Sequence, residues 1–205
     1  DVCSSDLVDH VSLSIPQNLI VAIMGKSGSG KTTLLNLIGT MDQPTEGKVF
    51  LEGIDMNEIK SKQRTNFRKR HIGFVFQFFH LLPMLTLEEN ILLPLKINRM
   101  KMDHPYFDEL TEVIGIKDKL KYYPNQLSGG QQQRGAIARA LIHKPDILLA
   151  DEPTGNLDSV TSREVENVLF TCARKYNQTF IYVTHDEDMG KKADRIFYME
   201  DGKIR

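Results

Sequence analysis

The sequence predicts an α/β fold in which helices cover both faces of a mostly parallel sheet. Short apolar segments alternate along the chain with longer segments of helical periodicity, as in layered folds of this class. Residues 19–24 and 147–150 are continuous apolar runs, which is typical of strands buried on both faces. The chain has 205 residues, which is long enough for one domain with a substantial core.

Each element can be placed in turn. Val11, Leu13 and Ile15 alternate with serines and predict a half-buried strand, and residues 16–18 form a turn. The buried strand at 19–24 leads through a glycine-rich loop into a helix containing Leu34 and Leu35. Further strands are predicted at residues 48–51, 72–76, 147–150, 180–184 and 195–199.

The middle of the chain, residues 85–127, has a helical pattern. Asp103 and Pro105 are start signals for one helix and Gly115 is a stop signal. Ser128 is expected to cap a helix that runs to residue 142, and another helix follows Asp158. We expect one domain over residues 1–205. Its core is formed by residues 1–78, which include a small antiparallel β subdomain, and by residues 136–205; residues 79–135 are an inserted helical subdomain.

Composition and charge exclude several classes of protein. The formal net charge is −1, so no overall basic field favours nucleic acid as a partner. The two cysteines, Cys3 and Cys172, show neither metal-ligand spacing nor a disulfide framework, which favours a reducing compartment. No apolar run approaches the roughly 20 residues that span a bilayer. Any role at a membrane therefore requires a partner.

A glycine-rich loop after the buried strand matches the pattern G-x-x-x-x-G-K-[ST]. Glycines allow the backbone to wrap closely around a phosphate, and the helix that follows adds the positive end of its dipole. Lys31 is expected to contact the β- and γ-phosphates, and the Thr32 hydroxyl to hold Mg²⁺. The predicted nucleotide-binding residues here are Gly25, Lys26, Ser27, Gly28, Ser29, Gly30, Lys31, Thr32 and Thr33.

The strand at 147–150 ends in two carboxylates. Asp151 is predicted to bind Mg²⁺, and Glu152 to polarise the attacking water as a general base or water-positioning group. Taken alone, this pair would more simply be a solvated strand end. The phosphate loop upstream favours the catalytic interpretation, because the carboxyl ends of parallel strands lie at one edge of the sheet.

A second helix start could bind an anion, at Ser128, Gly129, Gly130 and Gln131. The simpler interpretation is helix capping. One nucleotide could use both this segment and the phosphate loop only if the two came from different molecules. We therefore predict a head-to-tail dimer with two-fold symmetry and composite sites.

These motifs together identify a family. The run LSGGQQQR at 127–134, with the phosphate loop, LLADEP and a lone His185, closely resembles the ABC ATPases over nearly the whole chain. The resemblance implies a P-loop NTPase core, ATP and Mg²⁺ as cofactors, and catalysis by Lys31, Glu152, His185 and Gln77. Gln77 would also contact Mg²⁺, and Asp158 would lie at the dimer interface and contact nucleotide.

The first residues depart from the family pattern. ABC ATPases usually stack adenine on an aromatic side chain near the N-terminus, but residues 1–24 contain no Phe, Tyr or Trp. Residues 1–6 also lack the expected strand pattern. We expect that the natural start is missing, that residues 1–6 are not native, and that adenine is held less well as a result.

The apolar residues around Gln77 predict a docking surface. A run this apolar cannot all face inward if its middle is a loop. By family resemblance, residues 77–85 receive a coupling helix from an integral-membrane permease, and residues 79–85 include the contacts. The basic run at 60–70 is interpreted as mainly a solvated helix face, with attraction to an anionic membrane as the alternative.

The sequence segments around the motifs, such as LADEPTGNLDS, resemble those of bacterial ATPases for lipoprotein release, macrolide efflux or bacitracin-type peptide export. We favour the peptide branch, and expect the chain at the cytoplasmic face of the plasma membrane. A regulatory ATPase that switches a cell-wall enzyme through a permease-like protein remains the alternative. A chromosome ATPase would place long coiled coils between Lys31 and Ser128, and a P-loop kinase or GTPase would not need LSGGQ.

Overall fold

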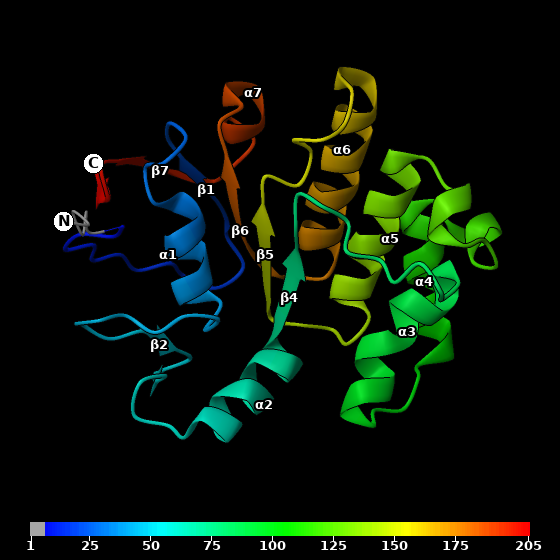
Figure 1. Ribbon diagram of the computed structural model, residues 1–205, viewed down its shortest axis with the longest axis horizontal. Coiled ribbons are helices and arrows are strands. Elements are labelled where there is room, and N and C mark those ends of the chain that lie inside the picture. The colour runs from blue at the N-terminus through cyan, green and yellow to red at the C-terminus, as the bar shows by residue number, and fades with distance from the viewer. Residues whose placement is uncertain (1–6) are drawn as a thin grey trace.

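The computed structural model describes residues 7–205, and its centre is a six-stranded sheet in the order β4-β5-β6-β1-β7-β8 (Figure 1). The expectation for residues 1–6 lies outside the described residues. The first five strands in that order are parallel, and β8 is antiparallel to β7. The strands are β1 (Ile20–Met24), β4 (Ile72–Val75), β5 (Ile147–Asp151), β6 (Thr179–Thr184), β7 (Arg195–Glu200) and β8 (Lys203–Ile204).

Helices alternate with these strands, as predicted. They are α1 (Lys31–Ile38), α2 (Ser61–His71), α3 (Leu87–Asn98), α4 (His104–Ile114), α5 (Gly129–Leu141), α6 (Ser159–Lys175) and α7 (Glu187–Gly190), with short 3-10 turns at Lys117–Lys119 and Pro124–Gln126. None of the helices among residues 7–205 is both long and apolar enough to cross a membrane.

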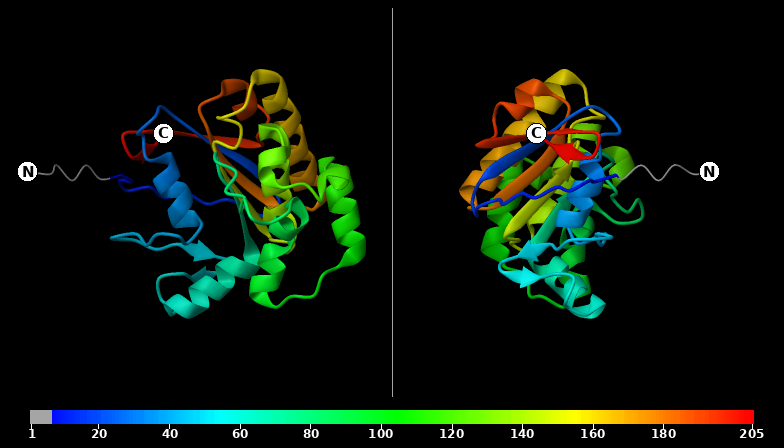
Figure 2. Two further views of the ribbon diagram at one scale, coloured as in Figure 1. Left: turned by 45° about the vertical axis from the view of Figure 1, so that its right-hand side comes forward. Right: turned by 90° about the vertical axis from the view of Figure 1, so that its left-hand side faces the viewer.

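Strand β1 is buried on both faces, which explains its continuous apolar run. Ile20, Ala22 and Met24 pack into one core cluster with residues of α3 to α6. Val21 and Ile23 pack into a second cluster with α1. Helices α1 and α6 therefore cover opposite faces of the sheet (Figure 2). The sheet lies between two apolar layers, so a polar side chain anywhere along β1 would be desolvated.

The small antiparallel sheet is shorter than predicted, and one predicted strand is wrong. Only β2 (Phe50–Leu51) and β3 (Ile54–Asp55) pair there. Residues 11–15 alternate between half-buried and exposed, as predicted, but form no strand. Val11, Leu13 and Ile15 pack on the second core cluster without a backbone hydrogen-bond ladder. Alternation reports burial of one face, and a strand also needs a neighbouring strand with which to pair.

The helical segment in the middle of the chain begins and ends where its capping residues predict. Asp103 caps α4 by accepting a hydrogen bond from the Tyr106 amide, and Gly115 ends the helix with φ of 73°. Helices α3 and α4 lie together at one side of the molecule (Figure 1). Helix α5 spans residue 135, so it runs continuously across the predicted subdomain boundary. The division into subdomains stays a prediction.

Close packing explains a glycine in the middle of α5. A Cβ atom on Gly135 would lie 2.3 Å from Leu87 Cδ1 on α3. A contact of 2.3 Å places the cost of overpacking at the upper end of its usual range, about 2–3 kcal/mol, and the gain in helix propensity offsets about 1 kcal/mol of it. We therefore expect Gly135→Ala to destabilise the protein by about 1–2 kcal/mol. Urea unfolding measures the change. In the Leu87→Ala background the same substitution should cost less; a neutral or stabilising Gly135→Ala would contradict close packing.

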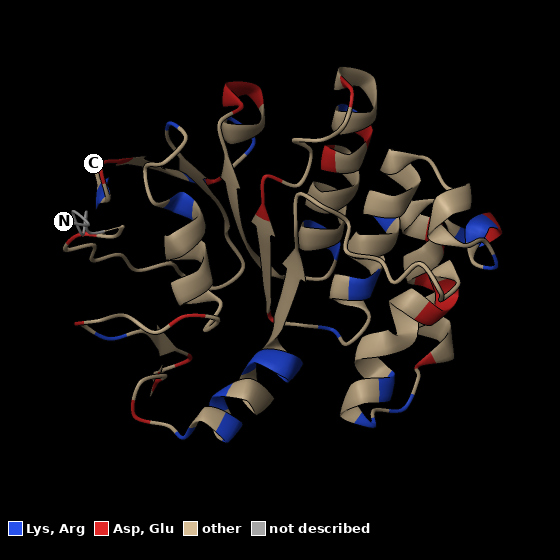
Figure 3. Cartoon of the chain, viewed as in Figure 1, with Lys and Arg blue, Asp and Glu red and all other residues tan. Residues whose placement is uncertain are grey.

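Helix α2 is the most basic element of the described chain, and none of its residues is buried. Figure 3 shows Lys and Arg along much of its length. Arg64 and Arg68 bond to the carbonyl oxygens of Met56 and Thr40, respectively. The helix is therefore anchored by two of its arginines, and its exposed surface is polar, as the sequence predicted.

Candidate functional site

The phosphate loop joins the end of β1 to the start of α1 and is held in a shape that requires glycine. Gly28 and Gly30 have φ values of 80° and 98°, which favour glycine. A Cβ atom on Gly25 would lie 2.1 Å from the Met199 carbonyl oxygen, and one on Gly30 would lie 2.0 Å from the Leu7 carbonyl oxygen. Because Gly30 caps α1 with no side chain, the first amides of α1 remain available to an anion.

Lys31 is buried at the floor of this loop. Its side chain bonds to the Lys26 carbonyl oxygen at 2.7 Å and approaches Ser29 Oγ at 3.5 Å. Burial lowers the pKa of Lys31, and the charges of Glu152 and Asp151 partly oppose this shift. A buried ammonium group whose close partners are neutral oxygens suits an anionic ligand such as a triphosphate.

Thr32 and Asp151 meet across the sheet edge, with Thr32 Oγ1 donating to Asp151 Oδ1 at 3.1 Å. Asp151 ends β5, where Figure 3 shows acidic residues. Burial raises the pKa of Asp151, and the charge of Glu152 adds to this effect. A hydroxyl beside a desolvated carboxylate is a donor set that fits Mg²⁺, and a cation there would offset the cost of burying the charge.

Glu152 and His185 face each other at the ends of neighbouring strands. Asp151 pairs with Val183 in the parallel register of β5 and β6, so the loops that follow lie side by side. His185 Nδ1 lies 3.3 Å from Glu152 Oε1. Glu152 adopts φ of 41°, a strained conformation for a residue with a side chain. Its backbone amide donates to the Val183 carbonyl oxygen, which holds the turn in place.

Gln77 is brought to the same edge through a reciprocal pair of hydrogen bonds with Asn156. Gln77 Nε2 donates to Asn156 Oδ1 at 3.3 Å, and Asn156 Nδ2 donates to the Gln77 carbonyl oxygen at 3.2 Å. A Cβ atom on Gly155 would lie 2.9 Å from Gln77 Nε2, so a larger residue there would displace the Gln77 amide. The loop after β4 and the loop after β5 are thus fastened together.

The Ser128 segment begins α5. Ser128 accepts a hydrogen bond from the Gln131 amide, and the Gln131 side chain accepts one from the Ser128 amide. A Cβ atom on Gly130 would lie 2.3 Å from Thr161 Cγ2, so glycine lets α5 approach α6. Ser128 itself is exposed. Among residues 7–205, no side-chain hydrogen bond joins the Ser128 segment to the phosphate loop.

Asp158 has a structural role within the described chain. Its carboxylate accepts hydrogen bonds from the amides of Val160 and Thr161 and caps α6. Hydrogen bonding to the Thr161 side chain, together with the two amide bonds, lowers the pKa of Asp158. The structure therefore brings Lys31, Thr32, Asp151, Glu152 and His185 to one edge, with Gln77 held beside them by Asn156, whereas Ser128 and Asp158 are occupied as helix caps.

Two contributors on α5 were missed by sequence reasoning, Gln133 and Arg139. Gln133 donates to backbone carbonyl groups in the loops that follow β4 and β5, and Arg139 donates to two carbonyl groups in the loop that follows β4. A signal for Gln133 was available, because it shares the buried face of α5 with Gly130, Ile137 and Leu141. A polar residue in an apolar stripe needs a partner, and the identity of that partner is not encoded locally.

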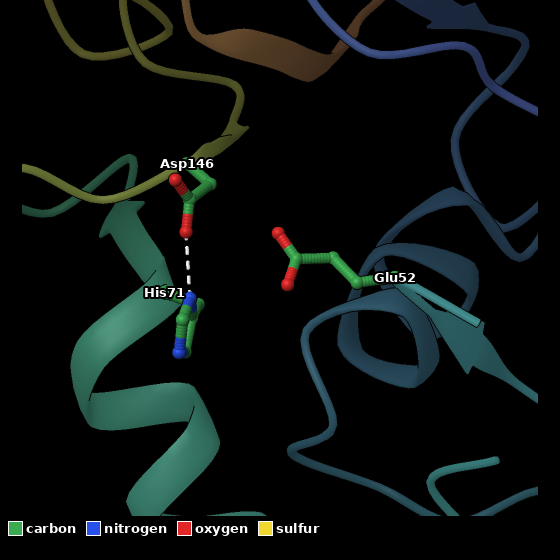
Figure 4. A group of neighbouring side chains, drawn as sticks. All are labelled: Glu52, His71 and Asp146. Carbon is green, nitrogen blue, oxygen red and sulfur yellow. Dashed lines mark hydrogen bonds and ion pairs between the residues drawn. The ribbon is translucent and has the colours of Figure 1, made fainter. Parts of the chain in front are cut away.

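A further group of ligating side chains, Glu52, His71 and Asp146, lies near the start of β5 (Figure 4). His71 Nδ1 and Asp146 Oδ2 are 2.6 Å apart, and the bond ties the end of α2 to the segment before β5. Strand β5 separates Asp146 from Asp151, at about 3.3 Å per residue. This group is therefore remote from the edge that carries the phosphate loop.

A parallel sheet with a glycine-rich phosphate loop, a buried lysine and a carboxylate pair at its carboxyl edge defines a P-loop nucleoside triphosphatase. The family model described as ABC transporter matches residues 8–155. The chain therefore belongs to the ABC transporter family, and it is an ATP-binding subunit that hydrolyses ATP. The predicted fold class and the predicted family are confirmed.

Several bacterial proteins are similar over nearly the whole chain. The lipoprotein-releasing system ATP-binding protein LolD of Bacteroides fragilis is 42% identical over 98% of this chain and 94% of its own length. The uncharacterised ABC transporter ATP-binding protein YvcR of Bacillus subtilis is 46% identical over 94% of this chain and 75% of its own. The macrolide export protein MacB of Rhodopirellula baltica is 44% identical over 95% of this chain but only 29% of its own.

Solved structures agree with this assignment. The bacterial ABC transporter cassette MJ0796, solved as a dimer, is 42% identical and superimposes with a TM-score of 0.87 over 97% of this chain and 88% of that one. A second dimeric structure of the same cassette, in a post-hydrolysis state bound to ADP and Pi, gives a TM-score of 0.85 at 41% identity, with the same coverage. Among the relatives named above, LolD and MacB match the predicted lipoprotein-release and macrolide subgroup.

Proposed function

We propose that this chain powers a separate membrane permease that exports a lipoprotein, a macrolide or an antimicrobial peptide. The observation that carries the proposal is similarity at full length to the ATP-binding subunit of a lipoprotein-releasing system. None of the helices within residues 7–205 could cross a membrane. We assign the membrane-spanning part to a partner because LolD is named as the ATP-binding protein of a larger releasing system. The chain would then work at the cytoplasmic face of the plasma membrane as a peripheral subunit.

Each site residue has a proposed role in ATP hydrolysis. The amides at the start of α1 and the Lys31 ammonium would bind the β- and γ-phosphates. Thr32, Asp151 and Gln77 would hold Mg²⁺, which supplies charge neutralisation at the phosphates. Glu152 would accept the proton of the attacking water, and His185, 3.3 Å away, would orient that carboxylate and contact the γ-phosphate.

The dimer proposal is supported by the exposed Ser128 helix start. Within residues 7–205 no side-chain hydrogen bond joins this helix start to the phosphate loop of the same chain. A second copy in head-to-tail orientation could therefore present residues 128–131 to the γ-phosphate. ATP would then join two copies, and hydrolysis would release them. The dimeric relative MJ0796 supports this arrangement.

The proposed docking surface for the permease consists of the exposed apolar side chains that follow Gln77. Phe78 and Met84 expose 64% and 72% of their surfaces, and Leu82 exposes 40%. Leu87, at the end of the same run, is completely buried and anchors the loop to the core. The exposed part is available to a partner, while the buried part holds its shape.

We expect Phe78→Glu combined with Met84→Glu to abolish co-purification with the proposed membrane permease. ATP hydrolysis by the isolated chain should change by less than about twofold, because neither side chain contacts the phosphate loop. Met41→Glu, at another exposed methionine, is the matched control. Pull-down from membranes and steady-state phosphate release measure the two effects. Retention of the permease by the double variant would contradict the docking surface.

A further inference from the structure

Gln133 is a polar side chain with no solvent exposure in the middle of α5. Its Nε2 atom donates to two backbone carbonyl oxygens, that of Phe76 at 3.0 Å and that of Pro153 at 2.6 Å. Phe76 directly precedes Gln77, and Pro153 directly follows Glu152. One amide group therefore ties α5 to the backbone on both sides of the reactive edge.

The environment of this amide indicates a purpose beyond packing. Its Oε1 atom is buried and has no hydrogen-bond partner among the described residues. A buried acceptor without a partner is destabilising relative to an apolar group of the same shape. Packing alone would therefore favour Met or Leu at this position. What only the amide provides is a pair of donors for two carbonyl groups that belong to different loops.

We propose that Gln133 is a positioning residue that couples the two ATP sites of the dimer. This inference rests on the proposed function, in which Ser128 contacts the nucleotide of the partner. Ser128 and Gln133 lie on the same helix, five residues apart, so they move together. Gln77 and Glu152 serve the nucleotide on their own phosphate loop. Occupation of one site would thus set the backbone around the reactive groups of the other.

A second tether on α5 strengthens the connection to one of the two loops. Arg139 donates from Nη2 to the Phe79 carbonyl oxygen at 2.8 Å and from Nη1 to the His80 carbonyl oxygen at 2.5 Å. It holds the segment after Gln77 but makes no bond to the loop after Glu152. Gln133 is the residue of α5 whose side chain reaches both loops, which makes it the position at which coupling can be tested selectively.

The test compares Gln133→Met with Gln132→Met on the same helix. Gln132 donates only to the Leu127 carbonyl oxygen of its own helix start, so it is a matched control. We expect Gln133→Met to lower kcat by roughly 10- to 100-fold, since small misplacements of reactive groups have effects of this size. KM and monomer ATP affinity should stay within about twofold. The Hill coefficient for ATP should fall to 1, whereas Gln132→Met should retain the unaltered value.

The outcomes separate this inference from the proposed function. ATP should still dimerise the Glu152→Gln, Gln133→Met double variant, because Ser128 is intact. If Glu152→Gln alone does not dimerise with ATP, the shared site is wrong. If Glu152→Gln does dimerise with ATP, two results overturn the coupling role of Gln133. One is that Gln133→Met keeps the kcat and Hill coefficient of the unaltered protein. The other is that the unaltered protein itself has a Hill coefficient of 1 for ATP. Should Gln133→Met not fold, Gln133→Asn tests the same bonds with an amide too short to span both carbonyls.

Discussion

Replacing Glu152 with Gln is expected to slow ATP hydrolysis by roughly 10²- to 10⁴-fold while leaving ATP binding intact. The amide keeps the shape of the carboxylate, so the turn at φ of 41° and the contact with His185 can persist. What it loses is the ability to accept a proton from water. The groups proposed to bind the phosphates, which are the α1 amides and Lys31, are untouched. Steady-state phosphate release and fluorescent-nucleotide titration measure the two quantities.

The matched control for this prediction is Glu46→Gln, the same change at an exposed loop residue outside the site. It should leave turnover unchanged. The Glu152→Gln protein should also accumulate as a dimer with ATP, because the step that separates the two copies is blocked. Turnover equal to that of the unaltered protein would show that Glu152 is not the general base.

Replacing Ser128 with Arg is expected to abolish ATP-driven dimerisation. Ser128 is exposed at the start of α5. In the proposed dimer a bulky side chain there would occupy the position of the γ-phosphate bound to the other copy. The substitution also removes the hydroxyl cap, which costs about 1 kcal/mol of stability. Binding of ATP to the phosphate loop of the same chain should continue, since no side-chain hydrogen bond joins Ser128 to that loop within residues 7–205.

Light scattering in the Glu152→Gln background measures this effect. Ser61→Arg, at the start of α2, introduces the same side chain at another exposed helix start and should leave dimerisation unaltered. A dimer of normal stability in the Ser128→Arg variant would show that the two copies do not share their ATP sites through α5.

Local chemistry explains why most of the fold could be predicted. The continuous apolar run of β1 required burial on both faces, and the structure places an apolar layer on each side. Asp103, Gly115 and Ser128 are capping residues whose effect depends only on nearby backbone groups, and each marks a helix end as predicted. Residues 11–15 were predicted wrongly as a strand because pairing depends on a distant segment.

At the site, too, features set by nearby residues could be predicted, and features that depend on distant segments could not. The shape of the phosphate loop depends on glycines with positive φ and on a lysine at the start of the next helix, all within a few residues. The loop could therefore be located from its sequence pattern alone. Taken alone, the carboxylate pair indicated only a strand end, and its catalytic interpretation needed the phosphate loop upstream. Its placement beside Thr32 depends on the order of strands in the sheet. The roles of His185 and Gln77 could be assigned only from resemblance to the family, because a single polar residue forms no recognisable sequence pattern.

The sequence by itself determined the class of this protein, the position of the phosphate loop and the capped helix starts, because these depend on groups a few residues apart. Only the tertiary structure decided which distant backbone atoms a buried side chain reaches. Gln133 is the clearest case, since its two carbonyl partners lie on loops after two different strands. A hydrogen bond between such segments depends on how helices pack against the sheet, and that geometry is set by the whole core.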